Sequence, residues 1–282
     1  MHSGTKPLQT IDHALEAQYA LRQRHPEREE VYNDHQRRSA ALRAGGDCQL
    51  DVRYGPGPRC LLDIFPAGGQ APVLFFIHGG YWRALDKSYV SFIAEPFRRA
   101  GMTVVMPTYD LAPAVRVSGI VDQIRTAFAW VRERLAPKRI VVAGHSAGGQ
   151  LAAMLALDQA ERGGGQIVGL AGISGAYDLR PLLQTSINSD LMMSAEEAAE
   201  ASPLVRLKRM GSIVPLIPFI GVVGGDETEG FKQWTADLVT LWGAHGGAAR
   251  YFELAGRSHF TVLDGIADAN GDIVRAIAAL VA

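Results

Sequence analysis

Short apolar runs that alternate with longer helical segments place the strongest constraint on how this chain folds. The runs lie at Leu61–Phe65, Val73–Ile77, Thr103–Met106, Ile140–Ala143, Val168–Ile173, Ile217–Val223 and Arg250–Leu254. Most of them are almost continuously apolar, as in strands that are buried on both faces. Helical periodicity fills the intervals, for example at Ile120, Ile124 and Phe128. The alternation predicts an α/β protein with a mostly parallel central sheet and helices on both faces.

The first part of the chain, residues 1–46, departs from this alternation. A weak helical stripe between Ile11 and Arg43 is interrupted by Pro26, which predicts two helices rather than one. We expect this segment to pack on the core or on a cap. Residues 47–282 form the predicted main domain.

Two further features modify the predicted sheet. A Pro/Gly turn alone separates Leu61–Phe65 from Val73–Ile77, which is too short for a parallel crossover, so this edge is predicted to be antiparallel. The long mixed segment 177–212 stands between two core strands and includes a helix-prone stretch at Ala195–Ala201. It predicts a small cap inserted at about 177–212.

The composition limits the class of protein. The 282 residues are 48% hydrophobic, which suits one large domain, and a formal net charge of -1 favours neither nucleic acid nor an acidic membrane as a partner. Residues 1–30 have no apolar run of signal-peptide length, and no stretch is apolar enough to span a membrane, so a cytoplasmic location is expected. Cys48 and Cys60 are predicted to be thiols.

The sequence Gly144-His145-Ser146-Ala147-Gly148 is the strongest candidate for a catalytic motif. It matches G-x-S-x-G and stands between the predicted strand Ile140–Ala143 and the helix-prone segment Gln150–Leu157. A serine at a sharp strand-to-helix turn has a strained backbone, and flanking glycines remove Cβ clashes. Ser146 is therefore predicted to be a nucleophile. The alternative is a glycine-rich turn with an incidental serine.

The sequence His78-Gly79-Gly80-Tyr81-Trp82 follows the predicted strand Val73–Ile77 and predicts an oxyanion hole. Backbone N–H groups stabilise the negative oxygen of an acyl-transfer transition state, at about 3 kcal/mol for each donor. We assign donors at Gly80 and Tyr81, together with Ala147 directly after the nucleophile. Gly79 is interpreted as the residue that forms the turn, and His78 as a side chain that ties the loop down.

A serine hydroxyl needs a base that takes its proton, and the base follows the nucleophile in this strand–turn–helix class. Of the eight histidines, His245 and His259 follow Ser146. His259 lies in a loop after the last predicted strand, whereas His245 ends an amphipathic helix. His259 is therefore the predicted base.

The predicted acid of the triad is Asp226. It lies in Gly224-Gly225-Asp226-Glu227, directly after the predicted strand Ile217–Val223. Its carboxylate would hold the imidazole in the working tautomer and stabilise the imidazolium. Glu227 and Glu229 are the alternatives. Asp226 could instead serve as the N-cap of the next helix.

The sequences HGGYW, GHSAGG, SGAYDLRPL, GGDE and RSHF together resemble the kynurenine formamidase (arylformamidase)-like branch of the α/β hydrolases, a relative of the hormone-sensitive-lipase-like esterases. The resemblance extends from about Val52 to the C-terminus. It implies the α/β-hydrolase fold with a triad of Ser146, Asp226 and His259. Tyr81 replaces the third glycine of the esterase HGGG motif, as is typical of the formamidase-like branch.

The resemblance implies a serine hydrolase that cleaves a formyl or acetyl group from an aryl amide, enamide or ester through an acyl-enzyme on Ser146. The predicted substrate contacts are the side chains of Trp82, His145, Met192 and Met193, where the aromatic residues would crowd the acyl side and the cap methionines would support an aromatic leaving group. The alternative is that these residues pack in the core.

An anionic substrate such as N-formylkynurenine would need a nearby cation, for which Arg83, Arg180 and Arg257 are candidates. The rival hypotheses are a general short-chain carboxylesterase or thioesterase and a ligand-binding receptor with the same fold. The sequence has neither a P-loop nor a dinucleotide-binding glycine motif after the first strand, nor a closely spaced set of metal ligands. We therefore expect no cofactor, no metal and a small-molecule substrate; a homodimer is a further hypothesis.

Overall fold

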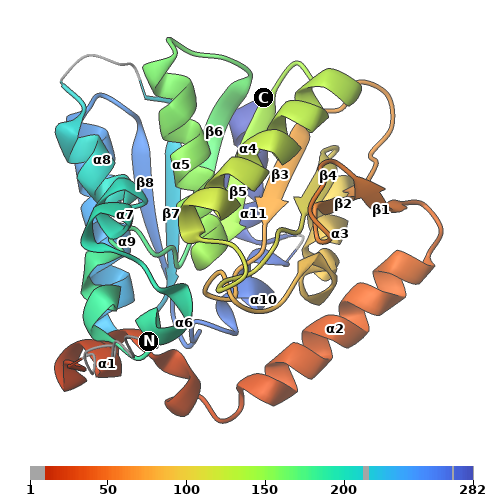
Figure 1. Cartoon of the computed structure of the whole chain (residues 1–282). Helices are drawn as coiled ribbons and strands as arrows, with labels where there is room; N and C mark the ends of the chain where they lie inside the picture. Colours follow the sequence, from red (N-terminus) through yellow and green to blue (C-terminus); the bar gives the residue numbers. More distant parts are fainter. Residues whose placement is uncertain (1–9, 212–215, 269, 282) are drawn as a thin grey trace, which may run out of the picture.

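The computed structural model describes residues 10–211, 216–268 and 270–281 (Figure 1). Residues 1–9 of the predicted N-terminal segment and Ser212 of the predicted cap lie outside the described residues. The described part of the chain contains no helix with the length and apolar character needed to cross a membrane.

An eight-stranded sheet with the order β1-β2-β4-β3-β5-β6-β7-β8 forms the centre of the molecule. The strands are β1 (Gln49–Arg53), β2 (Leu61–Phe65), β3 (Val73–Ile77), β4 (Thr103–Pro107), β5 (Ile140–His145), β6 (Ile167–Ile173), β7 (Phe219–Gly224) and β8 (Ala249–Leu254). The pairs β1–β2 and β2–β4 are antiparallel, and the other neighbours are parallel. The predicted fold class, with its antiparallel edge, is confirmed. β2 and β3 do not pair with each other, because β4 lies between them.

Helices cover both faces of the sheet (Figure 1). The α-helices are α1 (His13–Tyr19), α2 (Arg28–Ala44), α3 (Ala94–Arg99), α4 (Val117–Arg134), α5 (Ala147–Glu161), α6 (Asn188–Leu191), α7 (Ala195–Glu200), α8 (Pro203–Arg209), α9 (Glu229–Ala244), α10 (Val262–Ile266) and α11 (Asp272–Ala278). The 3-10 helices are η1 (Leu21–Gln23), η2 (Lys87–Tyr89), η3 (Ser91–Ile93), η4 (Arg180–Gln184) and η5 (Ala279–Val281).

Two apolar clusters, one on each face, hold these layers together. On one face, α4, α5, α8 and α9 bury side chains such as Ile120, Leu151 and Trp242 against the sheet. On the other face, α3, α10 and α11 bury Phe97, Leu263 and Ile277. The strands β3 and β5 are buried along their whole length, because their side chains pack into the cluster on one face or the other.

The N-terminal segment runs across one end of the molecule. Figure 1 shows α1 and α2 at the end where α6 and α10 also lie. Tyr19 at the end of α1 stacks on Trp234 of α9 with ring centroids 4.3 Å apart. On α2, the ring of His35 packs against Phe92 of η3 at 4.6 Å. The two predicted helices with a break at Pro26 are observed, and they cover the end of the sheet at which the candidate motifs lie.

Candidate active site

Ser146 occupies a strained turn between β5 and α5. Its backbone φ is 55° and ψ is -119°, in the left-handed half of the map that side chains rarely adopt. A Cβ at Gly144 would lie 2.2 Å from the carbonyl oxygen of Gly148, and a Cβ at Gly148 would lie 2.0 Å from that of Ile77. Both flanking glycines are therefore required by close backbone contacts. Ser146 lies at the N-terminus of α5, where negative charge is favoured.

His259 and Glu227 form a buried, hydrogen-bonded pair at the site. The Nδ1 of His259 lies 2.7 Å from Oε2 of Glu227, and both side chains are almost completely inaccessible to solvent. Phe231 of α9 packs against the imidazole with ring centroids 4.5 Å apart. The carboxylate accepts the Nδ1–H, which leaves Nε2 of His259 free to act as a base.

The prediction that Asp226 is the acid is wrong. Asp226 is exposed, and its backbone N–H donates to the carbonyl oxygen of Arg257 at 3.0 Å. This hydrogen bond fixes the turn after β7 so that residue 226 faces solvent and residue 227 faces the imidazole. Glu227, one of the two alternatives considered from the sequence, occupies the predicted position of the acid. Glu229, the other alternative, is exposed at the first turn of α9.

Two further groups bind the second oxygen of the Glu227 carboxylate. The hydroxyl of Ser174 donates to Oε1 at 2.5 Å, and the backbone N–H of Gly224 donates to the same atom at 2.8 Å. Ser174 follows β6, is completely buried and has a φ of 50°. Sequence reasoning missed Ser174, although it begins the motif SGAYDLRPL.

The loop after β3 has the geometry of an anion-binding turn. Gly80 has a φ of 112°, and a Cβ there would lie 2.1 Å from the carbonyl oxygen of Ala84; Tyr81 and Trp82 also have positive φ, at 51° and 55°. Within the described residues, no hydrogen bond uses the backbone N–H of Gly80, Tyr81 or Ala147. Hydrogen bonds within the described part of the fold thus leave these three N–H groups unused; Gly80 and Tyr81 are partly exposed, whereas Ala147 is completely buried.

His78 stabilises this loop by hydrogen bonds and ring stacking. Its Nδ1 donates to the carbonyl oxygen of Gly79 at 2.7 Å, and its Nε2 lies 3.2 Å from the hydroxyl of Thr108. The ring stacks on Tyr109 with centroids 4.3 Å apart. Burial lowers the pKa of His78 to about 4, so the ring is neutral at pH 7. This arrangement fits a structural role for the side chain.

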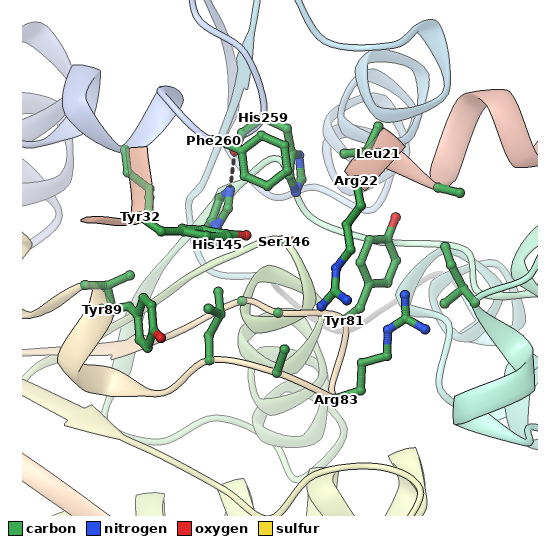
Figure 2. A pocket seen from close by; sticks show the side chains of 18 of the residues that line it. Leu21, Arg22, Tyr32, Tyr81, Arg83, Tyr89, His145, Ser146, His259 and Phe260 are labelled. Atoms are coloured by element: carbon green, nitrogen blue, oxygen red, sulfur yellow. Dashed lines mark hydrogen bonds between the residues drawn. The ribbon is translucent and has the colours of Figure 1, made fainter. Parts of the chain in front are cut away.

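Ser146 and His259 line one cavity of about 230 Å³ (Figure 2). The N-terminal segment forms much of its wall through Glu16, Leu21, Arg22, Tyr32 and His35, whereas segment 177–211 contributes Ser186 and Ile187. Figure 2 shows Tyr32 and Tyr89 on one side of Ser146, and Arg22, Tyr81 and Arg83 on the other. The cavity therefore has an aromatic side and a cationic side, and the N-terminal helices supply part of each.

The predicted substrate contacts divide into two groups. His145 lines the cavity. Trp82 does not, because its ring is completely buried and its Nε1 donates to Oε1 of Gln150 at 3.0 Å. Met193 is packed in the core at 5% exposure, and Met192 is on the surface at 48% exposure, outside the cavity wall. The predicted contacts from Trp82, Met192 and Met193 are therefore wrong.

Only one of the three candidate arginines lines the cavity. Arg83 lines the cavity and pairs with Asp190, whereas Arg180 pairs with Asp178 outside it, and Arg257 is not part of the cavity wall. Arg22, which sequence reasoning missed, is the second arginine of the wall. In the described part of the chain, no three His, Cys, Asp or Glu side chains gather in a way that could hold a metal ion.

Comparison with known proteins agrees with this geometry. A family model described as alpha/beta hydrolase fold matches residues 74–259. The kynurenine formamidase of Salmo salar is 31% identical over 228 residues, which cover 78% of this chain and 77% of the relative. The kynurenine formamidase of Danio rerio is 28% identical, covering 78% of each chain.

A solved structure from Silicibacter sp., described as a candidate thioesterase, is similar over almost the whole chain. It superposes with a TM-score of 0.79 at 33% identity and covers 88% of this chain and 93% of that one. The residues matched by the family model include the loop after β3 and the nucleophile turn, and the match ends at His259. The chain belongs to the α/β-hydrolase family and is a hydrolase of the branch that includes the kynurenine formamidases.

Proposed function

We propose that this enzyme removes a formyl or acetyl group from an aryl amide, enamide or ester through an acyl-enzyme on Ser146, with N-formylkynurenine as the first candidate substrate. The observation that carries the proposal is one small cavity that contains the strained Ser146 turn, the His259 base and a wall with an aromatic and a cationic side. The similarity to kynurenine formamidases over 78% of the chain supports the same substrate class.

The first chemical step of the proposed mechanism activates Ser146. Nε2 of His259 takes the proton of the Ser146 hydroxyl as the serine oxygen attacks the acyl carbon. Glu227 stabilises the imidazolium that forms, through the 2.7 Å contact with Nδ1. The N–H groups of Gly80, Tyr81 and Ala147 bind the oxyanion of the tetrahedral intermediate, each contributing about 3 kcal/mol to the transition state.

The second half of the reaction uses the same groups in reverse. The imidazolium of His259 gives its proton to the leaving nitrogen or oxygen, and the acyl group stays on Ser146. Water then attacks the acyl-enzyme, with His259 as the base that takes its proton. The imidazolium returns this proton to the Ser146 oxygen as the acyl–oxygen bond breaks, which releases formate or acetate. The free Nε2 of His259 is the group through which both protons pass.

The aromatic side of the cavity fits an aryl leaving group. The ring centroids of Tyr32 and Tyr89 are 6.0 Å apart, and those of Tyr32 and Phe260 are 5.6 Å apart, both in edge-to-face geometry. Burial raises the pKa of Tyr32 to about 12, so this wall is uncharged at pH 7. Aromatic side chains bind an aryl ring by offset or edge-to-face contacts.

The cationic side fits a carboxylate on the substrate. Arg22 is exposed and makes no ion pair within the described residues, and the Nε of Arg83 is buried without a partner there. The carboxylate of Glu16, which also lines the wall, accepts hydrogen bonds from the N–H and hydroxyl of Ser186 at 2.7 and 2.5 Å. A guanidinium binds a carboxylate through paired N–H donors.

Formate release from N-formylkynurenine, compared with hydrolysis of p-nitrophenyl acetate and butyrate, tests the proposal. We expect a higher kcat/KM for the formamide than for either ester. Ester or thioester hydrolysis without formamide cleavage would contradict it and favour a general short-chain esterase or thioesterase. Binding of the formamide without turnover of any substrate would instead favour a ligand receptor.

A further inference from the structure

His145 connects the nucleophile turn to the loop of the base. It is the last residue of β5, directly before Ser146, and it is buried. Its Nε2 lies 2.9 Å from the backbone carbonyl oxygen of His259, and the two imidazole rings are 4.8 Å apart (Figure 2). A side chain beside the nucleophile thus holds the main chain of the residue that activates it.

The hydrogen bond fixes the protonation of His145. A carbonyl oxygen can only accept, so Nε2 carries a proton. Burial, followed by the nearby charge of His259, holds the pKa of His145 well below its ordinary value, with a smaller contribution from His35 on α2. His145 is therefore a neutral ring at pH 7, with its proton on Nε2 and a bare Nδ1.

The loop after β3 packs against the other side of the same ring. A Cβ at Gly79 would lie 3.0 Å from Nδ1 of His145 and 2.9 Å from its carbonyl oxygen. Such contacts are shorter than a methyl group tolerates, so the loop comes this close because residue 79 is glycine. His145 thus contacts both the oxyanion loop and the base loop while it precedes the nucleophile in the chain.

We propose that His145 is a positioning residue that holds His259 in place for catalysis, an inference that rests on the proposed serine mechanism. Glu227 fixes the imidazole of His259 through Nδ1, and His145 fixes its main chain through the carbonyl oxygen. With both ends held, the orientation of the free Nε2 no longer depends on the loop alone. Such preorganisation accelerates reaction because it removes misoriented states of the base.

Two variants separate this role from simple packing. His145→Phe keeps the ring size but removes the donor, and His145→Gln keeps an N–H donor on a side chain of similar reach. With p-nitrophenyl acetate, we expect kcat of the Phe variant to fall about tenfold while KM changes little. A tenfold fall corresponds to about 1.4 kcal/mol, which is within the range for the loss of one hydrogen bond. The Gln variant should recover most of the rate.

The control and the contrary outcome follow from the same kinetics. His245→Phe, a matched change at the end of α9, should leave kcat and KM unchanged. A His145→Phe variant with the wild-type kcat, or a His145→Gln variant that recovers none of the lost rate, would overturn the proposal.

The wild-type protein provides a test that does not depend on how the variants fold. Nitrogen-detected NMR of ¹⁵N-histidine-labelled enzyme should show one buried neutral histidine with its proton on Nε2, with no titration between about pH 5.5 and 9. A His145 that titrates in this range, or carries its proton on Nδ1, would refute its proposed role as a positioning residue. This result does not depend on the activity of Ser146. Failure of the serine mechanism can therefore be distinguished from failure of the proposed positioning role of His145.

Discussion

Oε2 of Glu227 lies 2.7 Å from Nδ1 of His259, whereas the neighbouring Asp226 is exposed. We expect Glu227→Gln to lower kcat by about 10⁴-fold, because an amide supports the wrong tautomer and does not stabilise the imidazolium. Asp226→Asn is the matched control and should retain wild-type activity. Steady-state hydrolysis of p-nitrophenyl acetate measures both. Equal losses in the two variants would show that the acid has been assigned incorrectly.

Ser174 orients the acid through its 2.5 Å hydrogen bond to Oε1 of Glu227. Ser174→Ala removes a hydrogen bond to a charged group, which contributes about 1.5–3 kcal/mol in typical cases. Because Gly224 still holds the same oxygen, we expect kcat to fall by about tenfold. Ser189→Ala, which removes an exposed hydroxyl on α6 bonded to the Ser186 carbonyl oxygen, is the control. An unchanged kcat in Ser174→Ala would exclude the orienting role.

Arg22 should discriminate between anionic and neutral substrates. Arg22→Gln removes a charge from the cavity wall, so KM for N-formylkynurenine should rise about tenfold, the loss of about 1.4 kcal/mol of binding. The kinetics of p-nitrophenyl acetate, which has no carboxylate, should not change. Arg24→Gln, an exposed change outside the wall, serves as the control. If KM rises equally for both substrates, the arginine does not bind a carboxylate.

Asp264 of α10 ties down α2, the helix that carries Tyr32 into the cavity. It lies 3.1 Å from Nε2 of His35 and 2.6 Å from a guanidinium nitrogen of Arg38. Burial alone would raise the pKa of Asp264, but these hydrogen bonds outweigh it and lower the pKa.

A lowered pKa in the folded state stabilises the fold above the unfolded pKa of about 3.9, and this contribution is lost as the pH falls through the folded pKa. The difference in melting temperature between wild type and Asp264→Asn should therefore be present at neutral pH and shrink below about pH 4. Thermal unfolding at a series of pH values measures it, with the exposed Asp272→Asn as the control. A difference that grows towards acid would contradict the assignment.

The core strands could be predicted because their burial on both faces leaves a continuous apolar run. Leu61–Phe65 and Val73–Ile77 match β2 and β3 residue for residue. The strand β1 was missed for the opposite reason, since Gln49–Arg53 is an edge strand whose side chains are mostly exposed. An edge strand is stabilised by pairing with its neighbour, which is a contact between distant residues rather than a property of its own composition.

The acid could not be assigned from the sequence because Asp226 and Glu227 are neighbours of similar chemistry. The hydrogen bond from the Asp226 N–H to Arg257 decides which carboxylate turns inward, and Arg257 lies in a different loop. In the same way, positive φ values at Tyr81 and Trp82 direct the indole into the core towards Gln150. Both outcomes depend on backbone angles that the residue types alone did not reveal.

The segments that form the cavity wall could not be predicted from sequence patterns either. The segment 177–212 was expected to form the cap, yet the N-terminal helices provide Arg22, Tyr32 and His35. The stripe on these helices is weak because the segment docks through specific contacts instead. For example, the Tyr81 hydroxyl donates to the Tyr19 carbonyl oxygen at 2.6 Å, and the Thr228 hydroxyl donates to that of Gln18 at 2.8 Å.

Covalent labelling of the nucleophile tests the central claim most directly. A fluorophosphonate reacts with an activated serine, and the mass of the intact protein reports the adduct. We predict that the wild-type enzyme gains one adduct, located by peptide mapping on Ser146, and that Ser146→Ala gains none. An unlabelled wild-type protein that nevertheless hydrolyses p-nitrophenyl acetate, or a Ser146→Ala variant that is still labelled and active, would contradict the account.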